Sequence, residues 1–247
     1  MNILGVRIDN LNKKEILEKI EFFLTEETFH HIATVNPEFI LRAQRDLGFK
    51  SILNNSDLNV ADGVGIWYAF LRNFAYLKNR MAGVDLMEEV LKIANEKNET
   101  IFLAIHRNGL SLFEEIKGVL NEKYPNLIVD GMNIDPRKNK KILARINHAI
   151  VFCNFGFPEQ EKFINLLKKK HNSDLRLSGY QGKIRLAMGV GGSFDFITKK
   201  IRRAPRWMQK IGLEWLWRFI LEPRYRVKRI FNAVVVFPIK IIFKNTK

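Results

Sequence analysis

The stretch His30-His31-Ile32-Ala33-Thr34-Val35-Asn36-Pro37-Glu38 carries the pattern on which the fold depends. Its mostly apolar first part predicts a strand over His30–Val35 that stops at Asn36-Pro37. The residues that follow, Glu38–Gln44, predict a helix with proline at its first turn. A strand that leads directly into a helix is the repeating unit of an α/β fold.

Strand and helix patterns alternate along the chain on both sides of this stretch. The other expected strands are Ile3–Ile8, Leu58–Ala61, Thr100–Ile105, Leu127–Val129, Ala149–Asn154 and Arg185–Val190. The clearest amphipathic helices are expected at Lys13–Leu24, Leu110–Tyr124, Lys138–His148 and Pro158–Lys169. The polar segment His171–Lys183 is expected to be a loop or an excursion. This alternation predicts a Rossmann-like, largely parallel sheet with helices on both faces.

Length and composition fit one α/β domain with an appendage. The 247 residues and the 47% hydrophobic content are ample for a core. The single cysteine, Cys153, excludes an internal disulfide framework and suits a reducing compartment. The strand–helix pattern is complete by Phe196, so we expect an α/β domain over residues 1–200 that folds without the rest. Residues 201–247 are expected to form a basic, amphipathic, helical appendage.

Positive charge is concentrated in the C-terminal segment. The residues from Lys199 to Lys247 include 14 lysines and arginines but only two acids, so they carry +12 of the chain's net +15. Tryptophans and the apolar run Ile230–Phe243 are interleaved with these cations. Such a composition is typical of a segment that lies on an anionic membrane face. The run is shorter than the roughly 20 apolar residues that a spanning helix needs.

Polar and glycine residues follow several of the expected strands. They are Thr34 and Asn36, then Asp62 with Gly63 and Gly65, then Asn154 with Gly156, and finally Gly189 through Asp195. Each alone has a plain interpretation as a helix start, a turn or a tight loop. Together they favour a binding site, because ligands of open α/β sheets bind beyond the carboxyl ends of the strands. The glycine spacing is not G-x-G-x-x-G, which disfavours a dinucleotide fold.

The order of the short motifs resembles a known family. The motifs are Thr34–Glu38, Ala61–Gly65, Arg80–Asp85, Gly156–Glu161, Gly189–Phe196, Arg203–Trp207 and Glu222–Arg224. This order is similar to that of the WecG/TagA/CpsF glycosyltransferases, glycosyltransferase family 26. The resemblance implies transfer of a sugar from a UDP-sugar to a polyprenyl-pyrophosphate-linked saccharide, with inversion and without an essential metal or other cofactor. It also implies a role in cell-wall polymer synthesis, such as that of teichoic acid, with N-acetylmannosamine as the first choice of sugar.

The chemistry of an inverting transfer assigns roles to these residues. It needs a base near the attacking hydroxyl and positive charge near the departing phosphates. Asp62, in a glycine-flanked turn at a strand end, is expected to be the base, although it could instead cap a helix or turn. Thr34 and Gln160 are the other expected catalytic residues, Thr34 lining the pocket and Gln160 orienting the sugar or acceptor.

Arginine is expected to neutralise the diphosphate, because the chain has no D-x-D pair and no Cys/His cluster with metal-ligand spacing. No metal-binding residue is therefore expected. The expected substrate-binding residues are Asn36, Arg80, Gly189, Gly191, Asp195, Arg218, Arg224 and Arg226. Asp195 would accept from the uracil or ribose, or else cap the next helix. The arginines of the C-terminal appendage, residues 201–247, which we call the tail, either complete the site or only bind lipid headgroups. The sequence leaves both roles open.

Two other classes of protein compete with this interpretation. A nucleic-acid-binding protein would share the pI of 9.9 and the mixed Arg/Trp pattern, but Val234–Phe243 and the near-neutral body speak against it. A non-catalytic membrane scaffold would leave the strand-end polar residues unexplained. The expected partners are a UDP-sugar, a polyprenyl-pyrophosphate-linked acceptor and the inner, cytoplasmic face of the cell membrane. No nucleic-acid partner is expected. The sequence leaves open whether the chain forms homo-oligomers. Glu159 stands where the family usually has lysine. The resemblance survives this departure, but it does not fix the choice of donor sugar.

Overall fold

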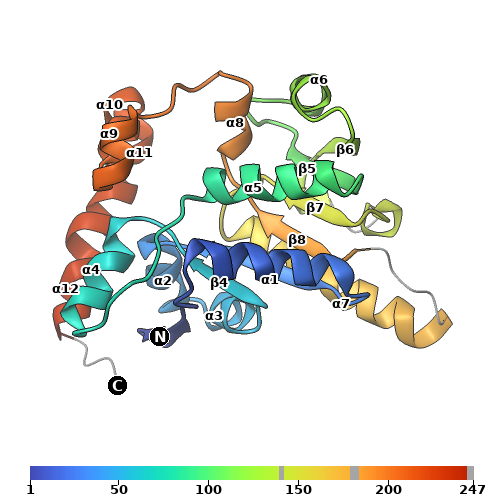
Figure 1. Ribbon diagram of the computed structural model, residues 1–247. Coiled ribbons are helices and arrows are strands. Elements are labelled where there is room, and N and C mark those ends of the chain that lie inside the picture. Colours follow the sequence, from blue (N-terminus) through green and yellow to red (C-terminus); the bar gives the residue numbers. More distant parts are fainter. Residues whose placement is uncertain (139–141, 179–183, 244–247) are drawn as a thin grey trace.

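The protein, seen in a computed structural model that describes residues 1–138, 142–178 and 184–243, is built on a six-stranded sheet (Figure 1). Neighbouring strands are parallel throughout, in the order β4-β3-β8-β7-β5-β6. The strands are β3 (His30–Val35), β4 (Leu58–Ala61), β5 (Thr100–His106), β6 (Ile128–Ile134), β7 (Ile150–Cys153) and β8 (Leu186–Gly189). The predicted Rossmann-like parallel sheet is confirmed.

Helices cover both faces of this sheet. One face is covered by α1 (Lys13–Thr25), α5 (Gly83–Glu96), α6 (Phe113–Lys123) and α8 (Ser193–Ile197). The other is covered by α2 (Pro37–Ala43), α3 (Leu47–Asn54), α4 (Val64–Arg72) and α7 (Glu159–Ser178). The C-terminal segment forms α9 (Arg206–Ile211), α10 (Glu214–Leu221), α11 (Pro223–Phe231), a π-helical turn (Asn232–Val236) and α12 (Phe237–Phe243).

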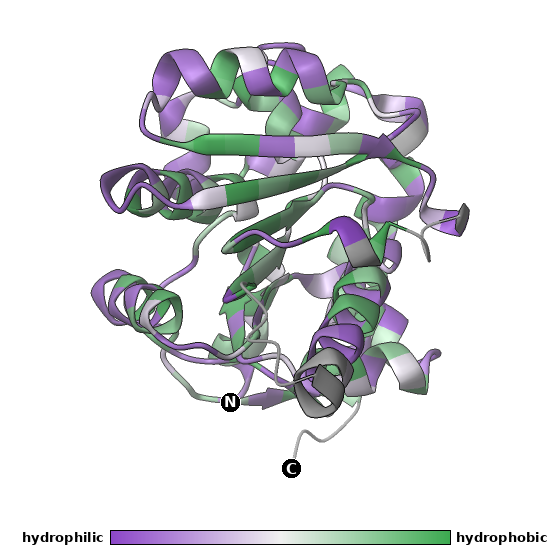
Figure 2. Ribbon diagram, turned by 90° about the vertical axis from the view of Figure 1, so that its right-hand side faces the viewer, coloured by the Kyte–Doolittle hydropathy of each residue, from purple (hydrophilic) through white to green (hydrophobic). Residues whose placement is uncertain are grey.

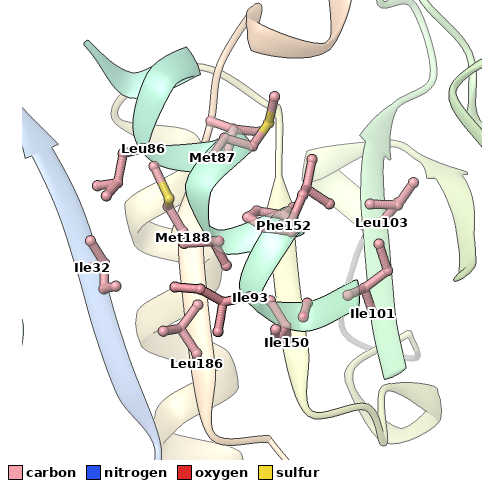
Figure 3. Close-up of a cluster of buried hydrophobic side chains, with 14 of the residues drawn as sticks. Ile32, Leu86, Met87, Ile93, Ile101, Leu103, Ile150, Phe152, Leu186 and Met188 are labelled. Atoms are coloured by element: carbon pink, nitrogen blue, oxygen red, sulfur yellow. The ribbon is translucent and has the colours of Figure 1, made fainter. Parts of the chain in front are cut away.

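Alternating strand residues supply the cores on the two faces. Ile101 and Leu103 belong to the α1–α5–α6–α8 side, whereas Phe102 and Ala104 belong to the other side. Figure 3 shows the first of these cores, where side chains of α5 pack onto those of β3, β8, β7 and β5. Apolar residues on both faces of the central strands explain why these runs are almost continuously hydrophobic. Figure 2 shows the same arrangement, with hydrophobic strands inside and hydrophilic stretches on the outer helices.

Three local predictions were wrong. The expected strand Ile3–Ile8 is a hairpin of β1 (Asn2–Ile3) and β2 (Val6–Arg7), because Leu4 and Gly5 turn the chain with positive φ. The expected helix Lys138–His148 is not found in its described part, which holds only 3₁₀ turns at Pro136–Lys138 and Leu143–Arg145.

The apolar residues that suggested that helix, Ile142, Leu143 and Ile146, instead pack from an irregular segment against the core on the α7 side. The expected loop at His171–Lys183 is helical as far as Ser178, since α7 continues and buries His171 beside Phe29. Residues 179–183, the last part of this expected loop, lie outside the described residues.

The C-terminal helices are packed onto the rest of the chain. Phe237 and Ile241 of α12 are buried in the same core as Ile66 and Phe70 of α4. The expected boundary near residue 200 therefore divides two segments that share one core. Among the described helices, none is long and apolar enough to cross a bilayer.

Candidate active site

The sheet order brings the predicted site residues to one edge. Strands β4, β3, β8 and β7 are neighbours, and all are parallel. Thr34 and Asn36 lie at the end of β3, Asp62 follows β4, Gln160 opens α7 after β7, and Gly189 ends β8. This is the carboxyl edge at which open α/β sheets bind ligands.

Asp62 is a carboxylate at this edge whose pKa is strongly raised. Its backbone N–H donates to the carbonyl of Val35 at 2.9 Å, which fixes it at the end of the β4–β3 pair. Burial raises the pKa of Asp62 to about 7, and nearby Glu214 adds to the rise, while the charges of Arg80 and Arg218 act in the opposite direction. A carboxyl group with a pKa near neutrality is suited to accept a proton during catalysis.

Ion pairs and hydrogen bonds hold the C-terminal segment beside Asp62. Arg203 contacts Asp85 at 2.6 Å and Glu214 at 3.4 Å, which ties α10 to α5. Arg80 donates to the carbonyl of Gln209 at 2.9 Å, at the end of α9. Arg80, expected to bind the donor, thus also docks the tail.

Arg218 points its guanidinium toward the loop after β8. The group lies over the ring of Phe196 at 5.1 Å. A Cβ atom added at Gly192 would stand 3.5 Å from Arg218 Nη2 and 3.2 Å from Asp195 Oδ2, so the two charged groups border the same glycine. Burial and, after it, the charge of Arg226 lower the pKa of Arg218 to about 10, so the group stays cationic at neutral pH. Its Nε is buried with no hydrogen-bond partner among the described residues, as a donor awaiting an anion would be.

The other tail arginines divide into two kinds. Arg226 is buried and close enough to Arg218 to depress its pKa. Arg229 forms a two-pronged ion pair with Glu38, with distances of 2.8 and 2.6 Å to the same carboxylate oxygen. Arg224 is exposed on α11. The structure therefore brings Arg218 and Arg226 together and leaves Arg224 at the surface.

Asp195 is held by a residue that carried no sequence signal. The hydroxyl of fully buried Ser111 donates to Asp195 Oδ1 at 2.7 Å and also contacts Thr198 at 2.7 Å. Burial raises the pKa of Asp195, and the Ser111 hydrogen bond and Arg218 oppose that rise. The residue that precedes α8 is Gly192, so Asp195 is not the N-cap of that helix.

Gln160 joins the loops that follow β7 and β8. Its side-chain oxygen accepts from the backbone N–H of Gly156 at 3.1 Å and of Gly191 at 3.0 Å. Its side-chain nitrogen donates to Glu161 at 2.7 Å. A Cβ atom at Gly189 would come within 2.4 Å of that nitrogen, which explains the glycine there. These contacts favour a positioning role for Gln160.

The side chains of Asn36 and Thr34 have different contacts in the structure. The Asn36 side-chain oxygen accepts from the N–H groups of Glu38 and Phe39 at 3.0 and 3.2 Å, so it caps α2. Thr34 is buried at the end of β3. Its hydroxyl would lie 3.2 Å from a Cβ atom at Gly83, so glycine lets the start of α5 approach this threonine.

Glu161, which the sequence did not single out, is a buried acid with one carboxylate oxygen lacking a hydrogen-bond partner among the described residues. Burial raises the pKa of Glu161 to about 8. Stability linked to this group is complete below its unfolded pKa near 4.5 and is lost as the pH rises to about 8.

Glu161→Gln should therefore unfold at a higher temperature than wild type at pH 8.5 and differ little at pH 5. The amide keeps an acceptor for Gln160, and each kcal/mol gained raises the melting temperature by about 2–4 °C in a chain of this size. Thermal unfolding at the two pH values measures this. The matched control is Glu159→Gln, since Glu159 is exposed. Equal pH dependence in Glu161→Gln and wild type would show that Glu161 ionises freely.

Among residues 1–138, 142–178 and 184–243, no group of three or more His, Cys, Asp or Glu side chains is placed to hold an ion. The polar side chains at the carboxyl edge are instead paired with arginines, hydroxyls and backbone groups.

Comparisons with known proteins identify the family of the chain. The family described as "Glycosyl transferase WecG/TagA/CpsF family" matches residues 1–247. A Bacillus subtilis (strain 168) protein named N-acetylglucosaminyldiphosphoundecaprenol N-acetyl-beta-D-mannosaminyltransferase is 34% identical over 232 residues, covering 91% of this chain and 81% of that protein. A protein of the same name from Staphylococcus aureus (strain MRSA252) is 28% identical over 247 residues, covering 98% and 91%. With a match over residues 1–247 and relatives at this level of identity, the chain belongs to the WecG/TagA/CpsF family of glycosyl transferases.

Proposed function

We propose that this glycosyltransferase moves N-acetylmannosamine from its UDP derivative to N-acetylglucosaminyl-diphosphoundecaprenol, with inversion, at the inner face of the membrane. The observation that carries the proposal is the placement of Asp62, with its pKa near 7, beside Arg80 and Arg218 at the carboxyl edge of the sheet. The names of the relatives supply the acceptor and the sugar, and the family resemblance supplies the nucleotide.

The reaction is a single displacement. Asp62 takes the proton from the acceptor hydroxyl as that oxygen attacks the anomeric carbon. The bond from this carbon to the diphosphate oxygen breaks on the opposite face, and UDP leaves with the electron pair. Arg218, with an unpartnered Nε among the described residues, stabilises the negative charge that develops on the diphosphate. Asp195, which accepts a hydrogen bond from Ser111, accepts another from the nucleoside in this proposal.

Purified protein should be offered a panel of UDP-sugars with a short polyprenyl-pyrophosphate-GlcNAc analogue. We expect turnover with UDP-N-acetylmannosamine and a product whose anomeric configuration is opposite to that of the donor. Retained configuration would contradict the single displacement, and turnover only with another UDP-sugar would contradict the choice of donor.

Transfer should persist in excess EDTA, because in this proposal guanidinium groups rather than a divalent cation neutralise the diphosphate. The initial rate should stay within about twofold of the untreated rate, a margin far below the effect of losing one charge-stabilising group. The rate is measured before and after dialysis against the chelator. Loss of activity that Mn²⁺ or Mg²⁺ restores would overturn the arginine assignment.

A further inference from the structure

Exposed apolar side chains gather on α4 and the turn that follows it. Trp67 and Leu71 of α4 are about half exposed, whereas Phe74 and Tyr76 in the turn are 96% and 80% exposed. Trp67, Leu71 and Phe74 follow one another at spacings of four and three residues, so the first two share the face of α4 opposite buried Ala69. Soluble monomers seldom leave such residues contiguous at the surface.

Helix α12 adds a second apolar row. Its inner residues Phe237 and Ile241 are buried, while Ile239, Ile242 and Phe243 are exposed, Phe243 at 83%. The outer side of α12 is therefore as apolar as its inner side. A helix that is apolar all round is typical of one covered on every side.

The two rows adjoin. A Cβ atom at Gly65 would lie 3.6 Å from the ring of Phe237, so the first residues of α4 and α12 are in contact. The two helices then run side by side in the same direction (Figure 1). We name the outward residues of these two packed helices and of the turn after α4 the α4–α12 face. It consists of Trp67, Leu71, Phe74, Tyr76, Ile239, Ile242 and Phe243.

We propose that the α4–α12 face enters the lipid bilayer, so that a helix of the catalytic body, and not the basic tail alone, docks the enzyme on its membrane. This inference rests on the proposed function, in which the acceptor is lipid-linked. Trp67 and Tyr76 have the amphipathic rings that favour the bilayer interface, and Phe74 is free to insert between acyl chains.

The positive charges beside the α4–α12 face identify an anionic bilayer as its binding partner. Arg72 is exposed between Leu71 and Phe74, and Lys240 lies on α12. Cations at the rim of an apolar surface attract anionic headgroups. A second copy of the chain, joined through the same face about a twofold axis, would bring a patch with these cations against its own copy. Like charges facing each other across an interface are costly.

The position of α4 gives this docking a catalytic consequence. Helix α4 begins two residues after Asp62 and has nine residues, a length of about 14 Å at 1.5 Å per residue. The helix therefore joins the proposed base at one end to the proposed bilayer contact at the other. Insertion of the Phe74 turn would set the height of Asp62 above the acyl chains, where a lipid-linked diphosphate emerges.

Phe74→Ser combined with Tyr76→Ser tests the face. Both side chains are almost fully exposed, so the variant should fold and melt like wild type. Sedimentation with vesicles of phosphatidylcholine and phosphatidylglycerol should show partitioning about 10- to 100-fold weaker than wild type, as expected for two lost aromatic insertions. Transfer to an acceptor embedded in these vesicles should fall in parallel, while transfer to a short water-soluble acceptor should not change.

The control is Ile128→Ser, because Ile128 is 60% exposed but begins β6, at the sheet edge opposite β4. It should partition like wild type. Undiminished vesicle binding of the double variant would overturn the proposal. So would a wild-type dimer that the double variant converts to monomer without lipid, because the face would then bind a second copy. Failure of wild type to use either acceptor would refute the proposed function, whereas the vesicle result alone decides the role of the face.

Discussion

Asp62→Asn should lower turnover by about 10²–10⁴ while the fold and the affinity for the UDP-sugar stay close to wild type. Asparagine has nearly the same shape but cannot take the proton of the acceptor hydroxyl. The rate with soluble acceptor and the dissociation constant of the donor are the two measurements. Near-normal turnover would remove Asp62 from the role of base.

The pH dependence sharpens this test. Because burial raises the pKa of Asp62 to about 7, kcat/KM of the wild type should rise as the pH increases through 7, where the carboxylate forms. The residual activity of Asp62→Asn should lack this rise. The matched control is Asp130→Asn, since Asp130 is an exposed carboxylate on the outermost strand, β6. It should keep both the rate and the pH profile.

Stability separates a lost base from a damaged fold. The native pKa of Asp62 lies above its unfolded value near 3.8, so the stability linked to it is lost as the pH rises from about 4 to about 7. Asp62→Asn removes that loss and should be at least as stable as wild type at pH 8. A variant that is stable but inactive is the pattern expected of a functional carboxylate kept at a cost in stability.

Much of the framework could be predicted because it depends on local pattern. The strands His30–Val35 and Leu58–Ala61 were predicted to the residue, since mostly apolar runs that end at Asn36-Pro37 and Asp62-Gly63 are typical of buried parallel strands. Strand β6 extends beyond the predicted Leu127–Val129, because as an edge strand it accommodates the exposed Asp130 and other polar residues. Such positions give no apolar signal.

The contacts that assemble the site could not be predicted in the same way. Glu38 and Arg229 are 191 residues apart, and Ser111 and Asp195 are 84 apart. No periodicity or spacing in the sequence links residues so far apart along the chain. Only the packed structure shows that Glu38 binds Arg229 of the tail and that Ser111 holds the carboxylate of Asp195. The sequence favoured Asp62 through its glycine-flanked turn, but its raised pKa depends on burial and on Glu214, which belongs to the tail.

The tail is packed into the hydrophobic core of the body, and this changes how its role should be tested. Removal of all residues from Ile201 onward would take Phe237 and Ile241 out of the core that contains Phe70. We therefore expect a truncated chain to lose stability, so that its inactivity would say little about chemistry. Single arginine substitutions leave these core residues in place, and they are the sharper test.

Arg218→Ala should lower turnover on a water-soluble acceptor by about 10²–10³, the effect of losing one group that stabilises developing charge. Its guanidinium borders Gly192 and Asp195, and its Nε has no hydrogen-bond partner among the described residues. Arg218→Lys should restore only part of the rate, because an ammonium group cannot make the same forked contact with a diphosphate.

Arg224→Ala provides the contrast, because Arg224 is exposed on α11. It should keep the rate on the soluble acceptor and lose about 1 kcal/mol of affinity for anionic vesicles, as expected of a headgroup contact. Rates on the soluble acceptor and vesicle sedimentation of the three variants separate the two roles. If Arg218→Ala turns over at the wild-type rate and loses only vesicle affinity, the tail is an anchor alone. The diphosphate would then be neutralised by Arg80 or another group of the body.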